Sequence, residues 1–252
     1  MSAYWWLIVP LAPLLAGLLL WRYPAQGRIA VALAPLPAIL VACIPPPALA
    51  LGWLWLPSLW GAEDWVSRIL LGFTALLWLL AGLYAAADRH LRSRGFWLFW
   101  LLALTGNLLL IIAVDSASFY VGFTLMSLSA YGLIIHNASP EARQAGRLYI
   151  QLAIIGEMLL FAGLMLRIHE AGGELLFIQW REVPTGLLTS ILILVGLGLK
   201  AGFWPLHIWL PYAHPAAPAA ASAVLSGAMI KAGILGLWRF LPDTGPELEH
   251  AP

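Results

Sequence analysis

Long apolar runs separated by short polar segments make up most of the chain. A run of about 18 to 25 apolar residues is long enough to cross roughly 30 Å of hydrocarbon as a helix. The pattern predicts an all-α membrane protein that forms one helical domain over residues 1–252. The eight predicted spans lie near residues 5–21, 29–44, 66–87, 96–114, 119–136, 148–168, 186–210 and 217–241. The first run has neither a basic leading segment nor a small-residue cleavage site, so we interpret it as a retained span.

Two connections between these spans are longer than simple turns and have a distinctive composition. Three consecutive prolines, 45–47, end the second span, and the tryptophan-rich stretch 48–61 that follows is too short to cross a membrane. It predicts either a small hairpin or an interfacial segment. Residues 170–184 form a second interfacial connection, with mixed charge and a Gly172-Gly173 turn signal.

Composition places the chain in a bilayer and excludes several classes of function. The 252 residues are 62% hydrophobic and 10% charged, and the mean hydropathy is +0.88. A net charge of +1 provides no basic surface for nucleic acid, and many of the 14 tryptophans lie near span ends, as membrane anchors do. The single cysteine, Cys43, excludes a disulfide framework and a cysteine-ligated cluster, and we expect it to be a small buried apolar residue.

The distribution of arginine predicts the orientation. Loops after the first, third and fifth spans carry Arg22, Arg28, Arg89, Arg92, Arg94, Arg143 and Arg147. Loops on the other side carry Arg68, Arg167 and Arg181 among the acidic residues Glu63, Asp64, Glu170, Glu174 and Glu182. Because cytoplasmic loops are rich in basic residues, both termini are expected outside a prokaryotic-type cytoplasmic membrane, and the acidic tail 243–252 agrees with this.

Three ionisable residues lie well inside predicted spans. The chain has only two lysines, Lys200 and Lys231, and both are surrounded by apolar sequence, as is Glu157. A charge at bilayer depth costs several kcal/mol, so such residues normally face protein or water and mark a proton or ion path. The structural alternative for Glu157 is a carboxylate that is neutral or paired locally with Arg or Ser. Asp115, at the turn between two spans, is expected to cap a helix.

The seventh span contains prolines that predict a broken helix beside Lys200. Pro205 and Pro211 each remove a helical donor, which frees the carbonyl groups of Ala201 and His207. Membranes accept free backbone groups only where these face protein or a hydrated cavity, so the break and the lysine predict one wet site.

Two histidines lie near the cytoplasmic end of this broken span. Histidine exchanges protons near neutrality, so His207 in the span and His214 in the turn after it suit a proton entry relay. The structural alternative is that each is an interfacial histidine satisfied by backbone. We expect no metal site, because no carboxylate or cysteine accompanies them to complete a ligand set.

A lysine paired with a carboxylate holds its proton, and a desolvated lysine without that partner releases it. Moving the partner charge therefore switches the proton affinity of the lysine, which is the elementary step of a proton pump. Glu157 is the candidate partner of Lys200 within this chain.

The sequence around the two lysines closely resembles a known superfamily. The stretch GLKAGFWPLHIWLPYAHPAAP followed by SAVLSGAMIKAGILGLWR resembles the seventh and eighth helices of antiporter-like proton-channel subunits. That superfamily includes membrane-arm subunits of respiratory complex I, large subunits of multi-subunit sodium/proton antiporters, and subunits of membrane-bound hydrogenases and formate hydrogenlyase. AHPAAP with SGAMIK looks most like the hydrogenase and formate-hydrogenlyase branch. Upstream, LYAAADRHLRSRGFW resembles the end of the third helix, and SFYVGFTLMSLSAYGLII resembles the fifth.

The resemblance implies roles for individual residues. Lys200 takes the place of the lysine in the broken seventh helix and Lys231 that of the lysine in the eighth, and in the family these relay protons along a central hydrated axis. The fifth helix of the family usually reads Trp-Glu-Leu-Met, whereas this chain reads Phe123-Thr124-Leu125-Met126. Thr124 therefore replaces the carboxylate that pairs with the seventh-helix lysine. Either Glu157 substitutes for it or the switch is lost.

The resemblance also implies partners. Family members typically have about fourteen helices in two inverted five-helix repeats, and this sequence matches the N-terminal portion as far as the eighth helix. We therefore expect other membrane subunits, among them a separate chain that supplies the remaining helices.

Together these observations predict a proton-translocating subunit, half of a split channel, in a multi-subunit energy-coupling membrane complex such as a hydrogenase or NADH/quinone oxidoreductase. No redox chemistry, cofactor or metal is expected in this chain. The alternatives are a non-pumping structural subunit of such a complex and a membrane subunit of an inorganic-carbon uptake complex. The sequence leaves open whether the ion is a proton or sodium, and which reaction is coupled.

Overall fold

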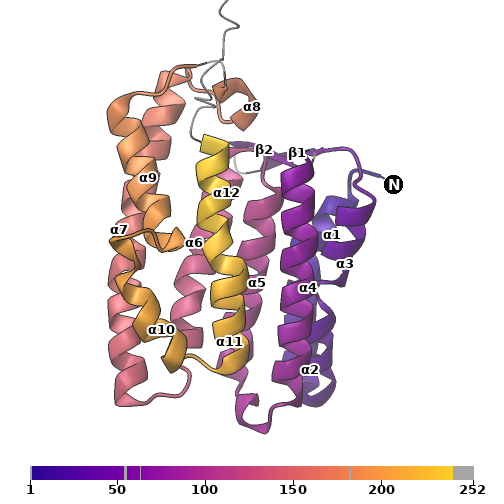
Figure 1. Ribbon diagram of the computed structural model, residues 1–252. Coiled ribbons are helices and arrows are strands. Elements are labelled where there is room, and N and C mark those ends of the chain that lie inside the picture. The colour runs from indigo at the N-terminus through magenta and orange to yellow at the C-terminus, as the bar shows by residue number, and fades with distance from the viewer. Residues whose placement is uncertain (1, 54–55, 63, 182, 241–252) are drawn as a thin grey trace, which may run out of the picture.

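The computed structural model describes residues 2–53, 56–62, 64–181 and 183–240. Its helices run roughly parallel to one another along the long dimension of the molecule (Figure 1). Within these described ranges, eight helical segments are long and apolar enough to cross a membrane, at Trp5–Arg22, Gln26–Cys43, Trp65–Ala87, Arg94–Ile112, Ser116–Ile134, Pro140–Glu170, Leu187–Ala216 and Ala219–Phe240. The prediction of an all-α membrane protein with about eight spans is confirmed.

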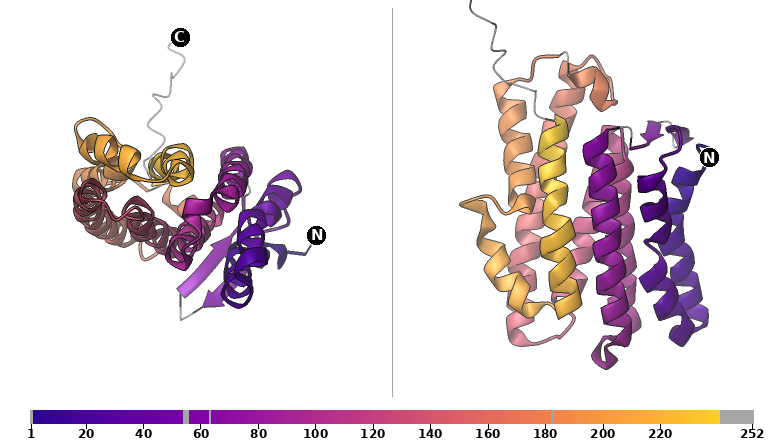
Figure 2. Two further views of the ribbon diagram at one scale, coloured as in Figure 1. Left: turned by 90° about the horizontal axis from the view of Figure 1, so that it is seen from below. Right: turned by 45° about the vertical axis from the view of Figure 1, so that its right-hand side comes forward.

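The N-terminal helices form one side of the bundle, and α7, α9 and α10 form the opposite side (Figure 2). Helix α1 spans Trp5–Arg22, and the second span is divided at Ala34-Pro35 into α2, Pro24–Leu33, and α3, Leu36–Cys43. Cys43 is exposed rather than buried, because it lies in the last turn of α3 on a surface that faces away from the bundle. The expectation of a buried cysteine was therefore wrong.

The tryptophan-rich connection after α3 forms a hairpin. Strands β1, Leu49–Trp53, and β2, Leu56–Trp60, pair antiparallel with Leu49 opposite Trp60. The Leu59 amide donates a hydrogen bond of 2.8 Å to the Asp115 carboxylate, and the Val114 amide donates one of 2.8 Å to the Leu59 carbonyl. These hydrogen bonds attach the hairpin to the turn between the fourth and fifth spans. Of the two predicted alternatives, a hairpin or an interfacial segment, the structure shows the hairpin.

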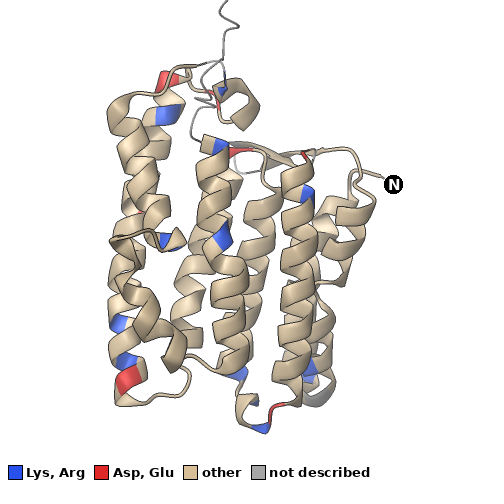
Figure 3. Cartoon of the chain, viewed as in Figure 1, with Lys and Arg blue, Asp and Glu red and all other residues tan. Residues whose placement is uncertain are grey.

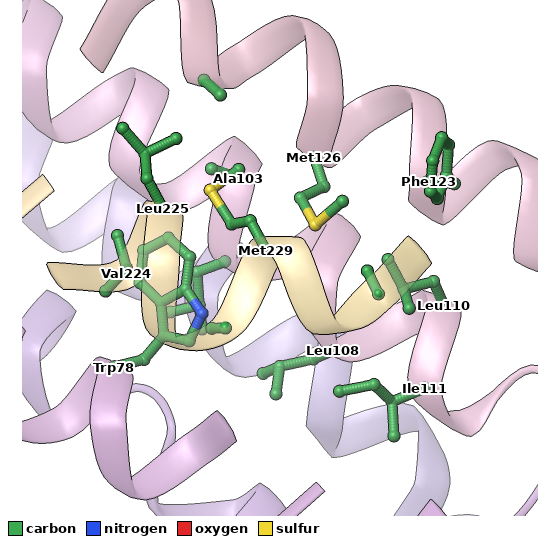
Figure 4. Packing of buried hydrophobic residues seen from close by; sticks show 14 of the residues in the cluster. Trp78, Ala103, Leu108, Leu110, Ile111, Phe123, Met126, Val224, Leu225 and Met229 are labelled. Carbon is green, nitrogen blue, oxygen red and sulfur yellow. The ribbon is translucent and has the colours of Figure 1, made fainter. Parts of the chain in front are cut away.

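The centre of the bundle is built from α4, Trp65–Ala87, α5, Arg94–Ile112, and α6, Ser116–Ile134; a short 3₁₀ turn, η1, Arg89–Leu91, precedes α5. Asp115 caps α6 by accepting a 2.7 Å hydrogen bond from the Ser118 amide, as expected. Helices α5 and α6 touch at two glycines, since a Cβ on Gly106 would lie 2.5 Å from the Gly122 carbonyl oxygen. Apolar side chains of the same two helices, among them Leu110 and Met126, pack in the core of the bundle (Figure 4).

Helix α7, Pro140–Glu170, begins well before the expected start of the sixth span near residue 148. Ser139 caps the helix and Pro140 occupies its first turn, where the missing N–H of proline is not needed. The first two turns are polar and carry Arg143 and Arg147, so a search for apolar residues alone misses them. At the other end, buried Arg167 donates to the carbonyl groups of Trp180, Val183 and Pro184 and holds the short helix α8, Phe177–Trp180.

The seventh span is interrupted in its middle. Helix α9, Leu187–Ala201, ends at Gly202, which has the left-handed backbone conformation that glycine adopts readily (φ 69°). A 3₁₀ turn, η2, Leu206–Trp209, leads into α10, Leu210–Ala216. The last span consists of α11, Ala219–Val224, a π-helical turn, η3, Leu225–Met229, and α12, Ile230–Phe240.

The start of α1 and the end of α12 lie at the same end of the bundle (Figure 1). Charged residues gather at the two ends of the bundle, and α9 and α12 each carry a Lys or Arg farther from the ends (Figure 3). Some acidic residues used to predict the orientation lie outside the described residues, namely Glu63, Glu182 and the tail 243–252.

Candidate functional site

Lys200 lies in the last turn of α9, immediately before the break, and only 5% of its surface is exposed. Helix α9 packs closely on α7 because both present glycine at the contact. A Cβ on Gly196 would lie 2.7 Å from the Leu160 amide nitrogen and 2.8 Å from the Gly156 carbonyl oxygen. This contact holds α9 close to α7. Lys200, at the end of α9, therefore lies beside side chains of α6 and α7.

The ammonium group of Lys200 is held by a tyrosine and a serine. Its Nζ donates a 2.8 Å hydrogen bond to the Tyr149 hydroxyl and a longer one, 3.4 Å, to the Ser127 hydroxyl. The Tyr149 hydroxyl in turn donates a 2.7 Å hydrogen bond to the Ser127 carbonyl, which fixes it as an acceptor for the lysine. The lysine is therefore solvated by hydroxyl groups from α6 and α7.

Glu157 lies on α7 and is also 5% exposed. The Thr124 hydroxyl donates a hydrogen bond to Glu157 Oε2, and Oε1 is buried with no hydrogen-bond partner among the described residues. Thr124 and Ser127 are three residues apart on α6 and so share one face of that helix. This face presents one hydroxyl to the carboxylate and the next to the lysine.

A small cavity joins these two groups. It has a volume of about 20 Å³, it contains room for about one water molecule, and both Lys200 and Glu157 line it together with Ser127 and Tyr149. Among the described residues, the only ion pair within 4.0 Å joins Arg167 and Glu170, so Lys200 and Glu157 face the cavity without direct contact.

Trp209 of η2, which follows the break, packs back against the end of α9. Its indole N–H donates a 2.8 Å hydrogen bond to the Leu199 carbonyl, and its ring packs edge-on against Tyr149 with 5.1 Å between ring centres. The break arises at Gly202 and the residues after it, including Pro205. We expected Pro211 to break the helix as well, but it lies in the first turn of α10, where proline is tolerated. The His207 carbonyl accepts a hydrogen bond from the Leu210 amide.

The two histidines lie outside the Lys200 cavity. His207 is half-buried on η2, and its Nδ1 has no hydrogen-bond partner among the described residues. His214 lies in the last turn of α10, not in a turn after the span, and its Nδ1 is 3.0 Å from the Ser222 hydroxyl of α11. Within the described ranges no group of three or more His, Cys, Asp and Glu side chains is placed to hold a metal ion.

Lys231 is half-buried in α12, directly after the π-helical turn. Its Nζ donates a 2.6 Å hydrogen bond to the Gly227 carbonyl and lies 4.8 Å from the centre of the Phe73 ring. Lys231 lines a different small pocket together with Ile111, whereas Phe123 lines the Lys200 cavity. Ile111 and Phe123 both belong to the packed apolar cluster of the bundle (Figure 4). The structure thus brings Lys200, Glu157 and Thr124 together, whereas Lys231 does not line the Lys200 cavity.

Three residues of the site, Ser127, Tyr149 and Trp209, were not singled out from the sequence. A signal for two of them was present, because Ser127 follows Thr124 by three positions and Tyr149 precedes Glu157 by eight, spacings that place each pair near one helix face. No comparable spacing points to Trp209, which reaches the cavity only because the chain turns back at Gly202.

Comparison with known proteins identifies the family. The family described as "NADH:quinone oxidoreductase/Mrp antiporter, TM" matches residues 113–249, which is more than half of the chain. The chain belongs to this family. The match includes Glu157, both lysines and the interrupted seventh span, so the candidate site lies within the part that defines membership.

Curated relatives come from several kinds of complex. The chain is 39% identical to Hydrogenase-4 component B of Escherichia coli over 54% of this chain and 21% of that protein. It is 31% identical to NAD(P)H-quinone oxidoreductase chain 4 3 of Picosynechococcus sp. over 77% of this chain and 38% of the relative. It is 30% identical to a Na(+)/H(+) antiporter subunit of Bacillus subtilis over 73% and 40%, respectively. The chain thus spans less than half the length of each of these relatives.

Solved structures confirm that the fold is part of the antiporter-like fold. A chain of the Mrp complex from Dietzia sp. superimposes with a TM-score of 0.81 at 24% identity, over 94% of this chain and 48% of that chain. A chain of the archaeal membrane-bound sulfane sulfur reductase superimposes with a TM-score of 0.79 at 25% identity, over 93% and 40%.

Proposed function

We propose that this protein is a proton-translocating subunit of a multi-subunit energy-coupling membrane complex, with Lys200 and Glu157 as its central proton-exchanging pair. Lys200 stores a proton, and Glu157 sets the affinity of Lys200 for that proton. The supporting observation is the small buried cavity that both residues line. A buried charge pair of this kind is expensive to maintain in a membrane bundle, which favours a transport role.

The arrangement around the pair suits reversible proton exchange. Glu157 Oε1 is buried without a partner among the described residues, and Lys200 is held by hydroxyl groups and not by a carboxylate. Approach of the two groups favours the ammonium–carboxylate pair, and separation favours proton release from the lysine. Among the described residues, Lys200 and Glu157 form no ion pair within 4.0 Å.

In this proposal His207 and His214 admit protons from the arginine-rich, cytoplasmic end, and Lys231 receives the proton laterally from Lys200. His214 and Ser222 provide a polar contact between α10 and α11 on that route. Transfer from Lys200 to Lys231 requires water or side-chain movement, because the two lysines line different pockets. Glycine contacts between α9 and α12 bring the two helices close, since a Cβ on Gly233 would lie 2.8 Å from the Leu197 carbonyl oxygen.

Membership of a larger complex is supported by the relatives, whose names describe them as a component, a chain or a subunit. We propose other membrane subunits as partners, in the membrane orientation predicted from arginine. Affinity purification followed by mass spectrometry tests this proposal, because co-purifying membrane polypeptides are the expected result.

Replacing Lys200 with Met tests the function. The complex that contains the protein is reconstituted in proteoliposomes, and proton uptake is followed with a pH-sensitive dye. We expect Lys200→Met to abolish proton uptake, whereas Arg143→Met, a change of an exposed cation at the bundle end, leaves it intact. Undiminished uptake by Lys200→Met would refute the proposal.

A second candidate function is a non-pumping structural subunit. The observation that favours it is Thr124 at the position where the resemblance expects a glutamate. Under this alternative, assembly of the complex depends on the protein and proton uptake does not, so the same Lys200→Met complex assembles and transports normally.

A further inference from the structure

A groove between α1 and α5 lies on the far side of the molecule from Lys200. It has a volume of about 320 Å³, which falls at the lower end of the ~300 to 1,000 Å³ typical of pockets for small ligands. Its walls are almost entirely apolar, and they include Pro13, Leu14, Gly17, Leu98 and Leu101. Both helices are membrane spans, so an occupant of this groove enters from the bilayer.

One end of the groove is charged. Arg94, the first residue of α5, lines it together with Trp21, and the Arg94 guanidinium carbon lies 5.2 Å from the centre of the Trp21 ring. A guanidinium stacked on an aromatic face keeps its N–H donors free at the edge of the plane, where they can bind a phosphate with two hydrogen bonds. Trp21 thus holds the arginine in place without neutralising it.

The surroundings of Arg94 favour an anion. Arg22 and Arg92 are exposed at the same end of the bundle, and the N-terminus of the 19-residue helix α5 adds its positive dipole end. This end is the arginine-rich one that we assign to the cytoplasm. The cytoplasmic leaflet carries the anionic lipids that basic residues near a span recognise.

We propose that this groove binds one anionic phospholipid, with an acyl chain along the apolar floor and the headgroup phosphate on Arg94. The apolar length of the groove and its single charged end match the two parts of a phospholipid. Neither an apolar helix nor a free phosphate matches both parts. The site is separate from the proton path, so it stands whether or not Lys200 moves protons.

Native mass spectrometry of the intact complex tests the site. The complex is incubated with vesicles containing phosphatidylglycerol or phosphatidylcholine, and the bound lipid is measured for each. We expect a preference for phosphatidylglycerol that falls about fivefold in Arg94→Gln, the loss that ~1 kcal/mol for one arginine near the surface implies. Arg143→Gln, which removes an exposed arginine of α7 at the same end, leaves the preference unchanged.

The apolar half of the site has its own matched pair of variants. Leu14 lines the groove, and its neighbour Leu15 is also exposed but does not. We expect Leu14→Trp to reduce binding of both lipids by filling the groove and Leu15→Trp to have no effect. Equal loss from Arg94→Gln and Arg143→Gln, or unchanged binding in Leu14→Trp, would overturn the proposal. Inorganic phosphate that competes as well as the lipid vesicles would also overturn it, since a free anion needs no apolar groove.

Discussion

The hydroxyl of Thr124 on α6 donates a hydrogen bond to the carboxylate of Glu157 on α7. Thr124 occupies the position where the resemblance expects the glutamate that pairs with the seventh-helix lysine. The carboxylate of Glu157 therefore ends beside the side chain that replaces that glutamate, and both lie near the cavity of Lys200. Compared with the pattern that the resemblance implies, the carboxylate comes from α7 instead of α6, and it still lies beside residue 124.

The hydroxyl of Tyr149 is expected to be needed for proton transfer at Lys200. Tyr149→Phe removes the closer of the two acceptors that Nζ contacts, at 2.8 Å. A hydrogen bond to a charged group contributes about 1.5 to 3 kcal/mol, so we expect the rate of proton uptake in proteoliposomes to fall by about tenfold or more. Tyr131→Phe, a change on α6 away from the cavity lining, serves as the control and leaves the rate unchanged.

An equal rate in the Tyr149 and Tyr131 variants would show that the hydroxyl only supports the fold. Binding of Lys200 by Ser127 alone would then be sufficient for its role.

Close contact between α7 and α9 predicts a strong effect of a small substitution. In Gly196→Ala the new Cβ lies 2.7 Å from the Leu160 amide nitrogen, so the helices must separate. Overpacking of this kind costs about 1 to 3 kcal/mol, and we expect a lower thermal unfolding temperature in detergent together with loss of proton uptake. In Gly72→Ala the new Cβ meets its nearest neighbour at 3.6 Å, an ordinary contact, so this helical glycine of α4 should accept alanine without loss.

Asp115 joins helix α6 to the hairpin, and its removal is expected to destabilise the protein. Its carboxylate accepts from Ser118 at the start of α6 and from Leu59 of the hairpin. Asp115→Ala removes the helix cap and leaves the Leu59 amide without its partner, a loss of about 1 to 3 kcal/mol. Asp115→Asn retains an oxygen acceptor and should fall between alanine and the original residue in thermal unfolding. Identical unfolding temperatures for all three would contradict the assigned role.

The fold was largely predictable from the sequence, because apolar length alone determines which segments can cross a bilayer. The polar start of α7 escaped prediction for the same reason, since Arg143 and Arg147 lie in a helix that extends beyond the apolar part. Proline was a partial guide at the seventh span. It indicated the interruption, but the left-handed Gly202 ends α9, and Pro211 begins the next helix.

The candidate site was predictable residue by residue but not as an arrangement. Charge in an apolar context indicated Lys200, Lys231 and Glu157, since few other reasons place such residues at bilayer depth. The sequence could not show which of them share a cavity, because that depends on the packing of α6, α7 and α9. Uncharged members such as Tyr149 carry no such compositional signal.

The most direct test of the central claim moves the carboxylate from α7 to α6. Proton uptake is measured in proteoliposomes for the original complex, for Glu157→Gln, and for Glu157→Gln combined with Thr124→Glu. The Thr124 side chain already contacts the Glu157 carboxylate, so a glutamate at residue 124 brings its charge to the same cavity. We predict that Glu157→Gln abolishes uptake and that the double variant restores much of it. Full uptake in Glu157→Gln alone would contradict the account.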